Sequence, residues 1–81
     1  VDFIVPKRGH ARMLVQVCES LSEPQTRKRE AAALGEAMGE LGLKTGTIVT
    51  RNEDERIDTG GGTIEVVPVW RFLLDLPELT K

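Results

Sequence analysis

Hydrophobic and polar residues alternate in two short segments near the start of the chain. Residues 1–5 and 13–18 are rich in aliphatic side chains, and a Pro-Lys-Arg-Gly-His cluster begins the stretch between them. This arrangement is typical of a β-hairpin. A loop over residues 7–11 would place Ile4 opposite Leu14 and Asp2 opposite Gln16. The sequence therefore predicts two antiparallel strands with a defined register.

The two faces of this hairpin differ in polarity, because side chains alternate between the faces of a strand. One face is wholly apolar and is expected to pack on a helix; it carries Val1, Phe3, Val5, Met13, Val15 and Val17. The other face is expected to be a mixed polar surface; it carries Asp2, Ile4, Leu14, Gln16 and Cys18. A slip of one residue would bring opposite faces together, so the apolar face supports the register.

A helix is predicted over residues 23–41. Its start, Ser22-Glu23-Pro24-Gln25, has the form of a capping box with Ser22 as the N-cap. Gly42 suits the position that follows the last turn. Apolar residues recur between them at spacings of three and four, as one face of a helix requires: Ala31, Leu34, Ala37, Met38 and Leu41.

In the second half of the chain we expect one strand, one hairpin and a last helix. Residues 45–50 are β-branched and follow a helix long enough to cross between parallel strands, so this strand is expected beside residues 13–18. Residues 51–55 are expected to form a solvated acidic turn. Residues 56–58 and 63–67 flank three glycines and are expected to pair as a hairpin, whose register the sequence does not define. A final helix is expected from Pro68 to Pro77, with Trp70, Leu73 and Leu74 as its buried side.

Composition narrows the class of protein. With 81 residues the chain forms one domain at most, and 11 Lys and Arg against 13 Asp and Glu give a net charge of -2, which provides no global attraction to nucleic acid or anionic lipid. No apolar run reaches the length that crosses a bilayer. The single cysteine fits a reducing compartment, so we expect a cytoplasmic protein. The chain begins with Val1 rather than Met, which suggests a piece of a longer protein.

The first hairpin has the layout of a metal-dependent nuclease core. Such a core places an Asp on one strand and an acid-any-Lys triplet on the next, because Mg²⁺ prefers carboxylate oxygens and the lysine stabilises charge at phosphorus. The corresponding positions are Asp2, Gln16 and Cys18, so an amide replaces the second acid and a thiol replaces the ammonium group. We expect no working metal site here, and a hydrogen-bonded buried amide and a buried thiol instead.

Several other residues are candidates for a chemical role. Cys18 is not expected to be a nucleophile, because the only histidine, His10, lies at the far end of the hairpin. Arg27, Lys28 and Glu30 are expected on a solvated helix face, with a catalytic group displaced onto this helix as the alternative. The Gly60–Gly62 segment is expected to be a turn and not a phosphate loop. Contacts with nucleic acid or another partner are assigned to Lys7, Arg8, Arg12, Arg27 and Lys28.

The order and spacing of several segments resemble a known family. These segments are residues 1–5, 14–18, 26–30 with Leu34 and Met38, 46–50 and 67–74. Together they resemble the uncharacterised carboxy-terminal domain of prokaryotic AAA-type ATPases, which is related to the PD-(D/E)XK restriction-endonuclease-like fold. The resemblance implies an α/β domain over residues 1–81 with a mixed sheet, an N-terminal hairpin, a crossover helix and a short C-terminal helix. It also implies an upstream ATPase module that this chain lacks, and no cofactor in this part.

The sequence therefore predicts a non-catalytic, nuclease-like accessory domain that helps a AAA-type ATPase recognise a partner, which is a protein, a nucleic acid or a second copy of the domain. Two alternatives stay open. One is a metal-dependent nuclease with displaced catalytic residues. The other is an oligomerisation module, since an unpaired sheet edge can bind another subunit.

Overall fold

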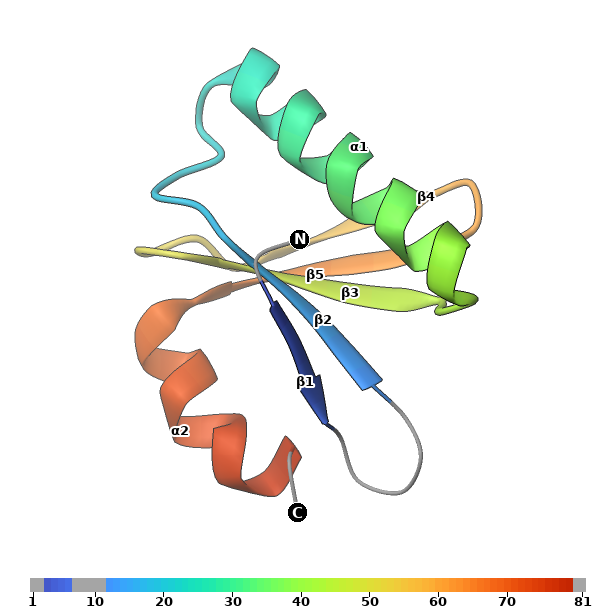
Figure 1. The fold of residues 1–81 in the computed structure, drawn as a ribbon. Helices are drawn as coiled ribbons and strands as arrows, with labels where there is room; N and C mark the ends of the chain where they lie inside the picture. The colour runs from blue at the N-terminus through green and yellow to red at the C-terminus, as the bar shows by residue number, and fades with distance from the viewer. Residues whose placement is uncertain (1–2, 7–11, 80–81) are drawn as a thin grey trace.

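The computed structural model describes residues 3–6 and 12–79 of the chain. One sheet lies between two helices, which cover its opposite faces (Figure 1). The elements in chain order are β1 (Phe3–Pro6), β2 (Arg12–Val17), α1 (Pro24–Leu41), β3 (Thr45–Thr50), β4 (Glu55–Thr59), β5 (Gly62–Pro68) and α2 (Val69–Leu79). The strand order in the sheet is β1-β2-β3-β5-β4. The predicted α/β class with a mixed sheet is confirmed at this level.

The register predicted for the first hairpin is confirmed over the described residues. Strands β1 and β2 are antiparallel, with Phe3 opposite Val15 and Ile4 opposite Leu14. Asp2, which was predicted to face Gln16, lies outside the described residues. The alternation of apolar residues supported this pairing, because a slip of one residue would turn the buried Val15 to the opposite face of the hairpin.

Helix α1 connects two parallel strands, as predicted from its length. Strands β2 and β3 are parallel, and Gln16 lies opposite Ile48. Strand β3 is also parallel to β5, whereas β4 and β5 form an antiparallel hairpin. The register of that hairpin, which the sequence left open, pairs Ile57 with Ile64 and Thr59 with Gly62, so that Gly60 and Gly61 alone make the turn.

The face of β2 that was expected to be a polar surface is instead the centre of the larger core. Leu14 has no exposed area, because α1 packs across this face. The prediction of a mixed surface is therefore wrong, and the alternation of polar with apolar residues here reflects a buried polar contact. The buried residues of this cluster are Leu14, Leu21, Leu34, Met38, Ile48, Ile64 and Val66.

The opposite face of the sheet packs against α2, through a smaller core of Met13, Val15, Val49 and Phe72. This confirms that the apolar hairpin face contacts a helix. The contact ends before Val17, whose side chain is 55% exposed although it lies on the same face. Within the described residues neither helix is long and apolar enough to cross a membrane.

The start of α1 was predicted incorrectly, and its end was predicted correctly. The predicted capping box is wrong: the helix has Glu23 as its N-cap, without a side-chain capping bond, and the Ser22 hydroxyl accepts a bond from Ser20 Oγ instead. The C-terminal prediction is confirmed. Gly42 adopts the left-handed conformation with φ of 68°, and the N–H of Leu43 donates to the Met38 carbonyl at 2.8 Å.

Helix α2 presents a different side to the sheet from the one predicted. Phe72 is buried, whereas Trp70, Leu73 and Leu74 are 58%, 61% and 72% exposed. Apolar residues cover more than half of the circumference of this helix, so periodicity alone did not select the side that packs on the sheet. Pro68 ends β5 and does not start the helix, and Pro77 lies within α2 and does not end it.

Gly62 occupies a position where no side chain fits. A Cβ atom added there would lie 2.3 Å from the carbonyl oxygen of Lys44, and that oxygen accepts the N–H of Thr63 at 2.9 Å. This close approach joins the start of β3 to the start of β5. The neighbouring Gly61 has open space around the corresponding position.

We therefore expect Gly62→Ala to destabilise the fold by about 1–3 kcal/mol, because the backbone of β3 or β5 must shift to relieve the overlap. Gly61→Ala is the matched control and should change the free energy of unfolding by less than about 0.5 kcal/mol. Urea denaturation of the two variants measures the difference. Equal stabilities would show that the backbone at Gly62 relaxes freely.

Candidate functional site

Gln16, the residue at the position of the second nuclease acid, is buried between the sheet and α1. Its side chain is on the α1 face of β2 and only 4% of the residue is exposed. The Nε2 group donates to the backbone carbonyl of Glu30 at 3.0 Å and to Glu30 Oε1 at 2.8 Å. The prediction of a hydrogen-bonded buried amide is confirmed.

Glu30 was expected on a solvated helix face, and this expectation is wrong. Its side chain is only 20% exposed and faces the sheet, with Arg29 Nε 3.8 Å from its other oxygen. The cause is helical spacing: Glu30, Leu34 and Met38 are four residues apart and lie on one stripe of α1, and both of the latter are buried. This spacing indicates from the sequence that Glu30 faces the sheet. It was not recognised, because a charged residue on a helix normally lies on the solvated face.

The second polar atom of Gln16 is buried without a partner. Gln16 Oε1 accepts no hydrogen bond among the described residues. The orientation of the amide follows from its surroundings, because both groups near Nε2 are acceptors and would repel the amide oxygen. Gln16 and Glu30 therefore bring two oxygen acceptors, one amide and one carboxylate, to the interface of β2 and α1.

Cys18, which was expected to be a buried thiol, is only half-buried and packs against the larger core. Its thiol donates to the backbone carbonyl of Ser20 at 3.3 Å, and its N–H donates to the Val49 carbonyl at 2.9 Å. Cys18 therefore supports the connection between β2 and α1. Asp2 and His10 lie outside the described residues, and residues 3–6 and 12–79 contain no cluster of three or more His, Cys, Asp or Glu side chains suited to a metal ion.

The acidic turn between β3 and β4 is more ordered than the expected solvated turn. Glu53 is half-buried and accepts the N–H of Leu21 at 2.6 Å through Oε1 and the hydroxyl of Ser20 at 3.3 Å through Oε2. Its own N–H donates to the buried Thr50 hydroxyl at 3.0 Å. This carboxylate therefore ties the β3–β4 turn to the segment that precedes α1, a contact that short-range patterns do not indicate.

The basic residues that were predicted to contact a partner differ in their surroundings. Arg27 is partly exposed, and it donates from Nη1 to Glu55 Oε2 of β4 at 2.6 Å, so this part of the predicted solvated helix face is paired with the sheet. Lys28 is exposed, as expected. Arg12 lies in β2, and Lys7 and Arg8 lie outside the described residues. A phosphate group near Arg27 would have to compete with the Glu55 carboxylate.

The Arg27–Glu55 contact changes the acid-base behaviour of both groups. The hydrogen bond from Arg27, aided by its positive charge, lowers the pKa of Glu55 against a smaller opposing effect of burial. The hydrogen bond to Glu55 likewise raises the pKa of Arg27. Both side chains are more than a third exposed, so water weakens the attraction.

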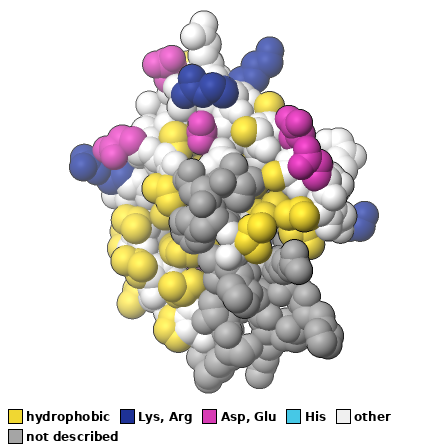
Figure 2. All heavy atoms as spheres, in the orientation of Figure 1, with side chains coloured by type: hydrophobic (Ala, Val, Ile, Leu, Met, Phe, Trp, Pro, Cys, Tyr) yellow, Lys and Arg dark blue, Asp and Glu magenta, His cyan; other side chains and the backbone are white. Residues whose placement is uncertain are grey.

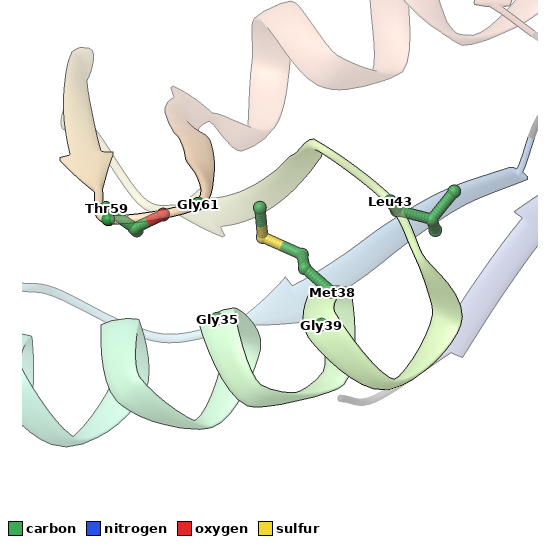
Figure 3. Close-up of a pocket in the computed structure, with 7 residues that line it drawn as sticks. Gly35, Met38, Gly39, Leu43, Thr59 and Gly61 are labelled. Atoms are coloured by element: carbon green, nitrogen blue, oxygen red, sulfur yellow. The ribbon is translucent and has the colours of Figure 1, made fainter.

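A hollow lies between the C-terminal half of α1 and the β4–β5 turn, and its volume is about 240 Å³. Figure 3 shows the Met38 side chain directed towards that turn. The only hydroxyl that lines it belongs to Thr59, which donates to the Gly62 carbonyl at 3.0 Å. The hollow is lined by Gly35, Met38, Gly39, Leu43, Thr59, Gly60 and Gly61, which offer little chemistry beyond van der Waals contact. The Gly60–Gly61 segment is a hairpin turn, as predicted.

Among the residues that the structure describes, the most exposed large apolar side chains lie on α2. Val69, Trp70, Leu73 and Leu74 are between 42% and 72% exposed and are here called the α2 outer face. Figure 2 shows hydrophobic side chains gathered over the part of the molecule that α2 occupies in Figure 1. A shallow hollow of about 230 Å³ next to the α2 outer face is lined in part by Val69 and the exposed Val17.

The contact between Gln16 and Glu30 leads to a stability test. Gln16→Glu would place two carboxylates at hydrogen-bond distance in a buried site, and should cost roughly 2–4 kcal/mol of stability at neutral pH. The double variant Gln16→Glu/Glu30→Gln restores an amide facing a carboxylate, and should recover part of this loss. Chemical denaturation of the single and double variants measures the coupling. Losses that simply add would contradict the contact.

The Glu55 contact leads to a pH test. The pKa of Glu55 is lower in the folded than in the unfolded chain. The ion pair with Arg27 therefore stabilises the fold at pH values above the ordinary glutamate pKa, roughly 4.3. This stabilisation is lost as the pH falls through the pKa that Glu55 has in the folded chain. We expect wild type to exceed Glu55→Gln by about 0.5 kcal/mol or less at pH 7. Thermal unfolding measured from pH 7 to pH 2.5 gives the difference in stability between wild type and Glu55→Gln, and this difference should disappear at acidic pH. A difference that widens in acid would be inconsistent with the lowered pKa. Glu40→Gln, an exposed change on α1, is the control.

Comparisons with known proteins give no match: no family model fits the chain, and no curated protein and no solved structure is similar to it. The geometry of the described residues is therefore the basis on which a function is proposed.

Proposed function

We propose that this chain is a non-catalytic recognition domain of nuclease-like architecture, joined to a AAA-type ATPase module, and that its partner binds the α2 outer face. The observation that carries the proposal is the exposure of Val69, Trp70, Leu73 and Leu74 on one helix. Contiguous apolar surface of this extent on a small domain is characteristic of a binding site.

The chemistry of the Gln16 site supports the absence of catalysis. A divalent metal that cleaves phosphodiesters requires carboxylate ligands. At the second acid position the chain has an amide, and its donor group is bonded twice to Glu30. The Glu30 carboxylate is thereby engaged in holding α1 on the sheet. At the lysine position Cys18 bonds the Ser20 carbonyl and supplies no positive charge.

The sequence resemblance supports the remaining parts of the proposal. The order of hairpin, crossover helix and parallel strand is compatible with a restriction-endonuclease-like arrangement. The resemblance to carboxy-terminal domains of prokaryotic AAA-type ATPases supports an ATPase module joined to this domain. A recognition domain of this kind would direct the ATPase to its partner without cleaving it.

A second candidate function is a metal-dependent nuclease with a displaced ligand, and one observation favours it. Glu30 reaches the sheet beside Gln16, and the buried Gln16 Oε1 has no hydrogen-bond partner among the described residues. Two oxygens of this kind are hard ligands. This alternative requires Glu30 to exchange its bonds with Gln16 for a metal ion, together with a further acid.

The two functions differ in their response to Mg²⁺ and Mn²⁺. We expect calorimetric titration of the chain with either ion to give no saturable heat below about 1 mM, because one carboxylate that is already hydrogen-bonded binds a divalent ion weakly. Incubation with supercoiled plasmid or RNA should give the same products with metal as with chelator. Asp2→Ala and Glu30→Gln should behave as wild type in both assays.

Metal-dependent cleavage that both substitutions abolish would establish the nuclease and contradict the recognition domain. Glu36→Gln, which changes an exposed glutamate about 1.7 turns further along α1, is the matched control for Glu30→Gln. Weak heats that all variants share would indicate adventitious binding to surface carboxylates and would agree with the proposal.

A further inference from the structure

Strand β4 is an edge of the sheet, and among the described residues it pairs with β5 alone. In β5 the N–H of Thr63 donates to the Lys44 carbonyl, on the side of β3, and so points away from β4. Asp58 lies opposite Thr63 and therefore directs its own N–H and C=O to the outer side of β4. Arg56 does the same, because these groups alternate along a strand. The outer side of β4 is thus a row of backbone donors and acceptors that another strand can bind.

The side chains of β4 change sign about Ile57. Arg56 and Asp58 are exposed on the face of β4 that points away from α1. Ile57 lies between them on the other face, where it packs against the larger core. Arg56 forms an ion pair with Glu65 at 3.2 Å, whereas Asp58 has no ion pair among the described residues. The edge therefore carries a base and an acid at equal distances from one apolar residue.

We propose that this edge binds β4 of a second copy of the chain, antiparallel and about a two-fold axis at Ile57, so that two five-stranded sheets become one. In such an isologous contact each copy supplies the same surface. Arg56 of each copy would lie opposite Asp58 of the other, and the two Ile57 side chains would meet at the axis. The inference goes beyond the proposed recognition function, because the contact uses neither the α2 outer face nor the Gln16 site.

The charges select this register among those that a two-fold axis allows. An axis perpendicular to the sheet keeps each residue on its own face, so it must pass through a residue of β4. An axis at Arg56 or at Asp58 would place that residue opposite its own copy, and like charges directly opposite are destabilising. The axis at Ile57 instead gives two pairs of opposite charge, and it places Thr59 opposite Glu55 without repulsion.

The backbone agrees with the same register. Arg56 and Asp58 both direct their N–H and C=O groups outward, so each Arg56–Asp58 pair between copies would exchange two hydrogen bonds, as in an antiparallel sheet. Ile57 would form the pair without hydrogen bonds, in which side chains approach more closely. An apolar contact at the axis is thereby flanked by hydrogen-bonded, oppositely charged pairs on both sides.

The helices leave room for this contact. Helix α1 packs over β2, β3 and β5, through the core that contains Leu14, Ile48 and Ile64. Neighbouring strands lie about 4.8 Å apart, so an axis just outside β4 would separate the two α1 helices by roughly 15–20 Å. A helix with its side chains is about 10–12 Å wide, so the two helices would not collide.

A second copy fits this edge better than an unrelated extended peptide. A peptide strand can form the same backbone bonds with a sheet edge. To match the side chains as well, it must place an acid opposite Arg56 and a base opposite Asp58, two residues apart on one face. Strand β4 itself meets this requirement when it is read in the opposite direction. The charge pattern is therefore self-complementary, and it disfavours strands that lack the pattern.

Sedimentation equilibrium of the chain from about 5 µM to about 1 mM tests the proposal. We expect a monomer–dimer equilibrium for wild type. Asp58→Lys places two bases opposite each other in both pairs and should raise the dissociation constant at least about tenfold. Glu40→Lys makes the same change of charge at an exposed position on α1, outside the contact, and should alter the constant less than about threefold. Circular dichroism checks that both variants are folded.

A mixture of two proteins tests the register. Asp58→Lys makes both charges of the edge positive, and Arg56→Glu makes both negative. Glu65→Lys accompanies Arg56→Glu, so that an ion pair within the chain is kept. Each protein alone should remain largely monomeric. An equimolar mixture should form a heterodimer about as readily as wild type forms its dimer, because every acid then lies opposite a base.

Amide hydrogen exchange, followed by nuclear magnetic resonance, locates the contact in wild type. The N–H groups of Arg56 and Asp58 should exchange more slowly at about 1 mM than at about 20 µM, since pairing between copies protects them. The N–H of Ile57 points to β5 in both states and should change little.

The proposal is overturned by a strict monomer at 1 mM, by a mixture of the two charge variants that does not associate, or by exchange at Arg56 and Asp58 that is independent of concentration. A dimer that Asp58→Lys leaves unchanged would also overturn it and would assign the contact to another surface. These failures are distinct from failure of the recognition function, which metal-dependent cleavage contradicts whatever the oligomeric state.

Discussion

The hydrogen bonds between Gln16 and Glu30 are the contact on which the larger core depends. They join the middle of β2 to α1 at a point where Leu14, Leu34 and Ile48 exclude water. The observed placement of α1 gives the buried Gln16 N–H group two acceptors, and a buried donor without acceptors is costly. Apolar side chains alone would tolerate several placements. The polar pair therefore defines the position of the helix, and the helix in turn positions the segments at the carboxyl ends of β2 and β3.

The same contact bears on the proposed absence of catalysis. At the position that the sequence resemblance assigns to a second metal-binding carboxylate, the chain has an amide whose donor group is already bonded. Glu30 brings a carboxylate to this place from the helix, and that charge holds the helix on the sheet. The neighbouring Cys18 likewise supports the backbone at Ser20. The chemistry of the site and the stability of the core therefore depend on the same atoms.

Local patterns predicted the sheet better than the helices. Alternation in residues 3–6 and 13–17 was enough to define the first hairpin, and the length of α1 was enough to predict parallel strands. The side of α2 was not predictable, because its apolar residues follow two helical stripes and only the path of the chain after Pro68 selects Phe72. The roles of Glu30 and Glu53 were also missed. Both carboxylates bond to residues more than ten positions away, and a charged residue in a sequence normally indicates solvent.

The most direct test of the account is the nuclear magnetic resonance signal of the Gln16 side-chain amide in ¹⁵N-labelled protein. If its two protons are bonded to Glu30, they should exchange slowly with water, and added paramagnetic Mn²⁺ should leave their signals unbroadened. Fast exchange of these protons, or selective broadening at low Mn²⁺ concentration, would show that the amide is not held by Glu30 or that a metal ion binds beside it, and either result would contradict the account.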